Sequence, residues 1–246
     1  MKMTLSFFSS AAVLAALTLS AKALLRDDTV VFAPPAQQHS SASSVVTSEP
    51  MAPPAPSSKA GSVRITMPFT SQAPFANWDA MHEETCEEAS LVLVKTFLDG
   101  KSTITEQEME NELQMLVQWQ TQNGYGQDVT MDELGKTAAG AYGLRYKVID
   151  ATRESIEKEL AAGNPVIMPA AGRELGNPYF SGEGPWYHVL VISGYDSSSY
   201  YTQDVGTKRG ANYRYDKDTL LAALHDWTGV KEETNTGPKR VLVVTK

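Results

Sequence analysis

The sequence contains a single cysteine, Cys86, and its surroundings suggest covalent chemistry. Nearly continuous apolar residues from Ala89 to Leu98 predict a buried helix that begins at Cys86 and ends before Gly100. A thiol at a helix N-terminus faces unpaired backbone N–H groups and the positive end of the helix dipole, and both favour the nucleophilic thiolate. Free cysteines also pack as small hydrophobic residues, so an ordinary core position is the alternative.

A nucleophilic thiol needs a base, and histidine is the first candidate at neutral pH. Of the four histidines, His188 begins an apolar strand, from which a rigid sheet can aim its ring at a helix N-terminus. A half-buried structural histidine is the alternative. His82 lies beside four glutamates in a turn, and we expect it at the surface. His225 ends a late helix, where a cation interacts favourably with the dipole, and His39 lies in a segment predicted to be disordered.

A carboxylate is needed to hold the histidine ring in one tautomer. Asp204 ends the next predicted strand, Tyr200 to Asp204, and could accept the second ring N–H of His188. Its rival Asp196 follows Gly194-Tyr195, which is better suited to a turn. A turn residue is also the alternative interpretation of Asp204.

The spacing His82-Glu83-x-x-Cys86 would also permit a metal half-site, because residues four apart share one face of a helix. This hypothesis ranks last, since it lacks a second histidine and a third ligand. One cysteine excludes intrachain disulfides and Cys-based zinc sites. The sequence has no glycine-rich phosphate loop and no Gly-x-Ser-x-Gly elbow, so we expect no nucleotide site, no metal and no cofactor.

The elements that must position these residues predict an α+β domain. A helical half carrying Cys86 is expected to pack on antiparallel strands that carry His188 and Asp204. Capping-box spacings at Thr105 and Thr130 predict two more helices, to about residues 120 and 142. The other predicted elements are strands at 63–67, 144–149, 165–168, 188–192, 200–204 and 240–245, and helices at 153–162 and 218–225.

The N-terminus predicts export. Lys2 precedes an apolar run from Leu5 to Leu19 that ends near Ala23, which is the layout of a secretory signal over residues 1–23. The run of about 15 residues is shorter than the ~20 needed to cross a bilayer, so cleavage is favoured over a retained anchor. Residues 24–62 are rich in Pro, Ser and Ala and predict a disordered linker, which leaves 63–246 as one folded domain.

The charge balance limits the partners. The chain has 21 Lys+Arg against 29 Asp+Glu, a formal net charge of -8, and no basic block. Nucleic acid is therefore not expected as a partner, because its binding depends on neutralising phosphates. Membrane contact is expected only through an uncleaved N-terminal segment, and the sequence does not indicate an oligomeric state.

The candidate residues occur in a recognisable order: Ser71-Gln72, Cys86-Glu87-Glu88-Ala89-Ser90, His188 to Asp196, and Gln203-Asp204. Over about residues 63–229 this order resembles the papain-like cysteine peptidases, and most closely the double-glycine leader peptidases and their exported peptidase-like relatives. The resemblance implies a papain-like fold. It also implies that Cys86 is the nucleophile, His188 the general base and acid, Asp204 the orienting residue and Gln72 the side-chain donor of an oxyanion hole.

Two features near the nucleophile qualify the resemblance. An oxyanion needs two donors, and the Gln72 amide would join the backbone N–H of Cys86; an exposed polar residue is the alternative for Gln72. The family commonly has glycine after the cysteine, where this chain has Glu87 and Glu88. Carboxylates close to the sulfur disfavour thiolate. We expect these two instead to point to solvent from the first helical turn.

Together these patterns predict an exported cysteine peptidase or amidase, either secreted, periplasmic or at the cell surface. Its substrate would be a peptide or protein, with cell-wall peptides among the candidates. The alternative is a catalytically inactive papain-like module that binds peptides or cell-wall fragments. Residues 172–185 form a loop long enough to act as a flap. Ordinary packing is favoured over groove lining for most of the nearby aromatic residues, which are Trp78, Tyr179, Phe180, Trp186 and Tyr187.

Overall fold

The computed structural model describes residues 61–246. The predicted signal and all but the last two residues of the predicted linker lie outside this part. Within the described residues, no helix is long and apolar enough to cross a membrane.

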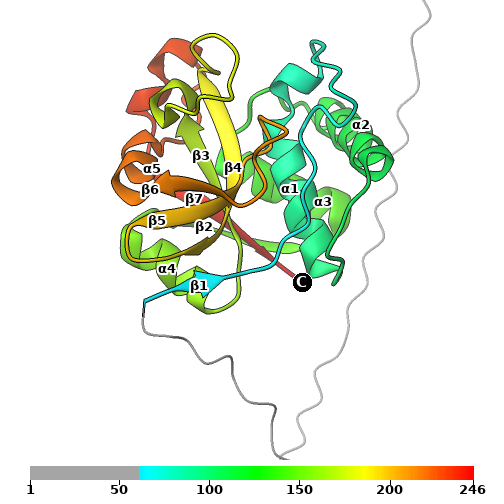
Figure 1. The fold of residues 1–246 in the computed structure, drawn as a ribbon. Coiled ribbons are helices and arrows are strands. Elements are labelled where there is room, and N and C mark those ends of the chain that lie inside the picture. The colour runs from blue at the N-terminus through cyan, green and yellow to red at the C-terminus, as the bar shows by residue number, and fades with distance from the viewer. Residues whose placement is uncertain (1–60) are drawn as a thin grey trace, which may run out of the picture. The chain divides into compact units, whose positions relative to one another are not determined.

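The centre of the domain is an antiparallel sheet in the order β2-β7-β3-β4-β5-β6 (Figure 1). The short strand β1 pairs with the end of β4 on the edge opposite β5. Glycine at position 194 allows β1 to approach β4, because a Cβ there would lie 2.3 Å from the Val63 carbonyl oxygen. The pairing of β4 with β5 has a bulge between Ile192 and Gly194. The strands are β1 Val63–Arg64, β2 Arg145–Asp150, β3 Val166–Ala171, β4 Tyr187–Tyr195, β5 Ser199–Gln203, β6 Tyr213–Asp216 and β7 Arg240–Thr245.

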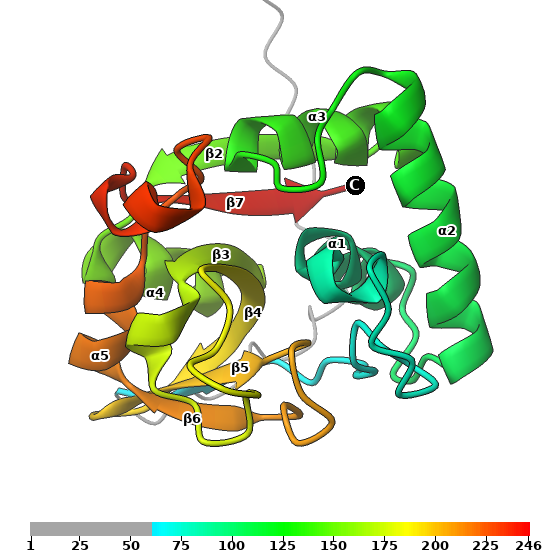
Figure 2. The same cartoon turned by 90° about the horizontal axis from the view of Figure 1, so that it is seen from above.

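Helices cover both faces of the sheet. On one face lie α1 Cys86–Leu98, α2 Glu106–Gln122 and α3 Met131–Tyr142, with α1 against β4 and α2 outermost (Figure 2). On the other lie α4 Arg153–Ala161 and α5 Lys217–Ala223. The side chains of Thr105 and Thr130 form the predicted capping boxes, and α3 ends at Gly143 with φ 68°.

Alternation along the strands divides the apolar residues between two cores. Val189 and Val191 of β4 face the core shared with α1, α2 and α3, whereas Leu190 and Ile192 face the core shared with α4 and α5. The helix that begins at Cys86 is thereby fixed against the strand that begins next to His188. The predicted α+β class, with a helical half packed on an antiparallel sheet, is confirmed.

Several predicted boundaries need correction. The strand expected over 63–67 contains only two residues, because the chain leaves β4 after the bond from the Ile65 N–H to the Ser193 carbonyl, 2.8 Å long. Asp204 follows β5 and does not belong to it. The strand β6 was not predicted, and the late helix ends at Ala223, so His225 lies beyond it. The helix over 86–98 and the strand over 240–245 have the predicted bounds.

Candidate active site

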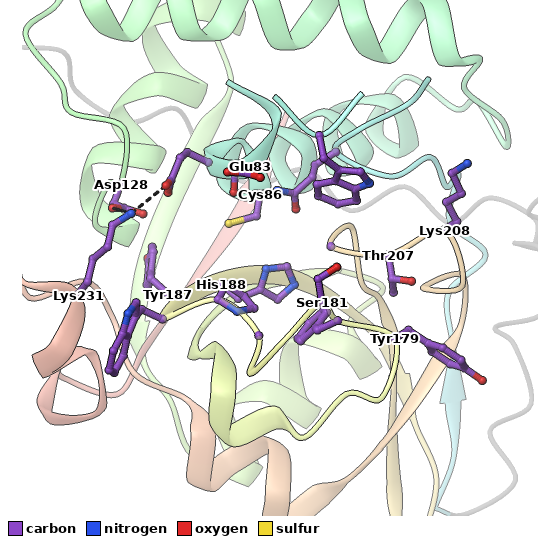
Figure 3. Close-up of a pocket in the computed structure, with 18 of the residues that line it drawn as sticks. Glu83, Cys86, Asp128, Tyr179, Ser181, Tyr187, His188, Thr207, Lys208 and Lys231 are labelled. Atoms are coloured by element: carbon purple, nitrogen blue, oxygen red, sulfur yellow. Dashed lines mark hydrogen bonds and ion pairs between the residues drawn. The ribbon is translucent and has the colours of Figure 1, made fainter. Parts of the chain in front are cut away.

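Cys86 is the first residue of α1 and lies on the wall of a cleft of about 610 Å³. The helix has no side-chain cap, so the first backbone N–H groups, that of Cys86 included, have no acceptor within the helix. Only 4% of Cys86 is exposed. His188 lies across the same cleft (Figure 3).

The thiol of Cys86 donates a hydrogen bond to Glu87 Oε2 at 3.0 Å. Glu87 is fully buried, and its other oxygen accepts the backbone N–H of Val129 at 3.1 Å. Burial raises the pKa of the Cys86 thiol well above its usual value, and the negative charge of Glu87 and the hydrogen bond to it raise this pKa further. The expectation that the helix N-terminus would favour thiolate is therefore wrong for the free protein, because these effects outweigh the dipole.

The expectation that both glutamates point to solvent is also wrong. Glu87 is 0% and Glu88 1% exposed, because the loop before α3 and the outer helix α2 cover the start of α1. Burial, and for Glu87 also the charge of Glu88, raises the pKa of both carboxyl groups, that of Glu88 to about 7. The sequence pattern shows a polar first turn, but the loop and the helix that bury it are distant in the chain.

His188 and Asp204 form a buried pair. The Nε2 atom of His188 lies 2.8 Å from Asp204 Oδ1, and the two residues are 2% and 0% exposed. With Nε2 engaged, Nδ1 is the ring nitrogen left to act on a group in the cleft. The Phe180 and His188 rings pack edge to face, with centroids 5.2 Å apart. This contact fixes the ring plane.

Asp204 accepts three further hydrogen bonds, from residues that the sequence did not reveal. Its Oδ1 accepts the N–H of Gly206 at 3.1 Å, and its Oδ2 accepts Asn177 Nδ2 at 2.9 Å and the Tyr215 hydroxyl at 2.6 Å. Burial alone would raise the pKa of Asp204, but the His188 charge and these bonds outweigh it and lower the pKa. The carboxylate is thus held ionised beside His188.

Gln72 borders the cleft, is 3% exposed and lies close to the start of α1. Its Nε2 donates to the carbonyl oxygens of His82 at 2.8 Å and Glu83 at 3.4 Å, in the short 3-10 helix η1 (His82–Glu84) before Cys86. Its Oε1 is buried without a hydrogen-bond partner. The backbone N–H of Gln72 donates to the Val205 carbonyl at 2.9 Å, next to Asp204. Gln72 thus contacts the segment that leads into Cys86 and lines the same cleft.

Aromatic residues form much of the cleft wall, contrary to the expectation that most of them pack internally. Trp78, Tyr179 and Trp186 are 43%, 44% and 38% exposed, because they project from loops over the opening. The loop over 172–185 contributes several of these lining residues. Lys231 adds a cation, which pairs with Glu84 at 2.8 Å (Figure 3). The volume of the cleft and its aromatic walls are typical of ligand-binding sites.

The remaining histidines lie outside this arrangement. His82 is not at the surface: it is 2% exposed, with its ring between Asp79 Oδ1 at 2.8 Å and Glu110 Oε2 at 2.9 Å. It therefore does not form a half-site with Cys86. The His225 ring bonds the Gly237 carbonyl at 2.7 Å, and His39 lies outside the described residues. No group of three His, Cys, Asp or Glu side chains in residues 61–246 could hold a metal ion.

A helix-borne thiol lies across a cleft from a histidine of an antiparallel sheet, and that histidine is paired with an aspartate just beyond the next strand. This arrangement defines a cysteine hydrolase of the papain-like kind. A family model described as "Peptidase_C39 like family" matches residues 64–234, and the chain belongs to this family of cysteine-type peptidases. The resemblance drawn from the sequence is confirmed.

Solved structures similar to this chain include two peptidases. One is titled a putative C39-like peptidase from Bacillus anthracis; it is 13% identical with a TM-score of 0.48, over 75% of this chain and 98% of that one. Another is a double glycine motif protease from an AMS/PCAT transporter in complex with the leader peptide; it is 16% identical with a TM-score of 0.42, over 76% and 94%. A search of the curated proteins found no match.

Proposed function

We propose that the protein is an exported cysteine peptidase or amidase that cleaves a peptide or amide bond through a thioacyl intermediate on Cys86. The observation that carries this proposal is the buried His188–Asp204 pair in the same cleft as the single cysteine. Membership of a peptidase family supports the reaction class.

The reaction follows from the positions of these groups. Cys86 Sγ attacks the substrate carbonyl carbon while its proton passes to Nδ1 of His188. The C–N bond then breaks, and His188 returns the proton to the leaving amine. A water molecule, deprotonated by His188, attacks the thioester, which releases the acid and restores the thiol. Asp204 stays ionised and stabilises the imidazolium that forms twice in this cycle.

The neighbours of Cys86 decide when its proton leaves. Burial and Glu87 keep the sulfur protonated in the free protein, so we assign the proton transfer to the moment of attack and do not invoke a stored thiolate. The backbone N–H of Cys86 and one N–H of Gln72 are the proposed oxyanion donors. For this role the amide must exchange one of its contacts to the η1 carbonyls for the oxyanion.

Export and substrate class are part of the proposal. The features of residues 1–62 support secretion or a periplasmic or cell-surface location, with a tether if the signal is retained. The acidic charge and the aromatic cleft favour peptide or protein substrates, cell-wall peptides among them. Mass spectrometry of the exported chain should find a new N-terminus near residue 24; an intact Met1 would contradict cleavage.

An inactive peptide-binding module is the second candidate, and the Cys86–Glu87 hydrogen bond favours it because it keeps the thiol protonated. The test is incubation of the protein with a complex peptide mixture, followed by mass spectrometry of new termini. Activity predicts cleavage that disappears in Cys86→Ala and His188→Ala but persists in His225→Ala, a histidine outside the cleft. Peptides retained but never cut by the wild type would overturn the peptidase proposal.

A further inference from the structure

A second, smaller pocket of about 200 Å³ lies beside the start of α1, between this helix, α2 and the loop after α2. Its wall contains Val117 and Tyr125, which are apolar or aromatic, and the polar residues Thr85 and Gln120. Clefts for drug-sized ligands are typically ~300–1,000 Å³, so this volume suits one side chain better than a whole ligand.

The pocket contains a buried carboxyl group without a partner. Glu88 is 1% exposed, and neither of its oxygens has a hydrogen-bond partner. The Gln120 amide and the Glu88 backbone N–H are near enough to favour the charged form, but neither reaches hydrogen-bond geometry. Thr85 Oγ1, in the same wall, is also buried and unpaired. Unpaired buried polar groups are costly, so two in one pocket indicate a missing ligand.

The unpaired carboxyl group and the apolar wall of the pocket favour an organic cation as the ligand. Glu84, on its rim, is already paired with Lys231 at 2.8 Å, which leaves Glu88 as the carboxyl group without a counter-ion. The described residues contain no cluster of three side chains suited to a metal. A lysine or arginine side chain fits instead, because its aliphatic stem can lie along Val117 and Tyr125 while its charged head meets Glu88 and Thr85.

The pocket is adjacent to the catalytic cleft. Glu84 lines both spaces, and Thr85 directly precedes the proposed nucleophile Cys86. We propose that this pocket is a specificity subsite in which Glu88 binds a lysine or arginine side chain of the substrate near the scissile bond. This inference rests on the proposed peptidase function, because it assumes that the bound peptide is a substrate. Binding at the subsite can nevertheless be measured without any cleavage.

The experiment uses capped alanine pentapeptides that contain one central arginine, lysine, citrulline or norleucine. Binding to the full-length Cys86→Ala protein is measured by titration calorimetry, so that no turnover is required. Citrulline matches arginine in shape but carries no charge. We expect arginine and lysine peptides to bind roughly tenfold or more tightly than citrulline and norleucine peptides, as close charge pairs at interfaces do.

The isosteric Glu88→Gln change, made in the same Cys86→Ala background, should abolish this preference. Glu106→Gln, an exposed glutamate at the start of α2, is the matched control and should preserve it. Equal affinity for the arginine and citrulline peptides would overturn the subsite, whether or not the Gln variant folds. Hydrolysis of the same peptides by the wild type reports separately on the peptidase function, so a preference in binding without cleavage would support the subsite and reject the proposed reaction.

Discussion

The Cys86 thiol donates its hydrogen bond to Glu87, the next residue along the chain, at 3.0 Å. Through this contact the Glu87 carboxyl group raises the pKa of the thiol. Because Glu87 also accepts the Val129 N–H, it connects the nucleophile to the loop before α3.

Glu87→Gln should lower the pKa of the Cys86 thiol. The amide can still accept the Val129 N–H, but it removes the negative charge and gives the sulfur a donor. We expect iodoacetamide to alkylate Cys86 roughly tenfold faster at pH 7, with the pH profile moved to lower pH. Glu83→Gln, an exposed neighbour, is the control. An unchanged profile would show that burial alone sets the acidity of the thiol.

Removing the Tyr215 hydroxyl should destabilise the protein. Tyr215→Phe removes one hydrogen bond, 2.6 Å long, to the buried Asp204 carboxylate, and a hydrogen bond to a charged group contributes about 1.5–3 kcal/mol. Urea unfolding at pH 7 measures the loss, and peptidase assays should show a lower kcat because Asp204 orients His188. Tyr213→Phe, on the same strand but without a hydrogen bond to Asp204, should leave both quantities near wild type. Equal stability of the two variants would argue against this role.

The supporting residues around Asp204 show where sequence reasoning ends. The helix at Cys86 and the two capping boxes follow from local patterns, and so do the apolar strand of His188 and the position of Asp204 near the end of another. Asn177 and Tyr215 reach Asp204 from positions 27 and 11 residues away, and no local spacing marks them. Only the folded sheet brings them to one carboxylate.

The burial of the two glutamates after Cys86 could not be predicted for a related reason. A helix N-terminus attracts acidic side chains, and in an isolated helix these point into water. Here the cover comes from Val129, which contacts Glu87, and from Gln120 beside Glu88, both distant in the chain. The local sequence predicts acidic residues at the start of a helix, but it does not show which distant segments pack over them.

Gly206→Ala should displace the His188 ring. A Cβ at residue 206 would lie 2.8 Å from His188 Cε1, closer than real contacts allow, and 3.0 Å from Phe180 Cε1, which is a tight contact. Misplacing a catalytic group by about 1 Å can lower the rate ~100-fold, so we expect a loss of kcat of that order. The assay should use an uncharged peptide substrate. Gly126→Ala is the control, because its new Cβ would meet its nearest atom at 3.6 Å. Full activity of the Gly206 variant would show that the ring has room to adjust.

Glu88→Gln should stabilise the protein above neutral pH. Burial raises the folded-state pKa of Glu88 to about 7, whereas the unfolded value is ~4.3. As pH rises between these values, the unfolded chain releases this proton first, so wild-type stability falls. The variant has no ionisable group at this position, so its free energy of unfolding should rise by about 3 kcal/mol relative to that of the wild type between pH 4 and pH 8. Urea unfolding of both proteins at pH 4 and pH 8 measures this change. The same difference in unfolding free energy at the two pH values would show that the Glu88 carboxyl group is solvated in the folded protein.

The bond from the Gln72 N–H to the Val205 carbonyl, 2.9 Å long, joins the two halves of the domain beneath the reacting groups. One side of this bond belongs to the loop that leads to Cys86, and the other follows Asp204 directly. The bond therefore ties the segment before the nucleophile to the segment after Asp204. The loop over 172–185 reaches the cleft wall next to this bond, since the Tyr179 ring lies under the Arg209 guanidinium, with its centroid 4.7 Å from it. A movement of that loop would therefore widen the cleft without breaking the bond between the two halves.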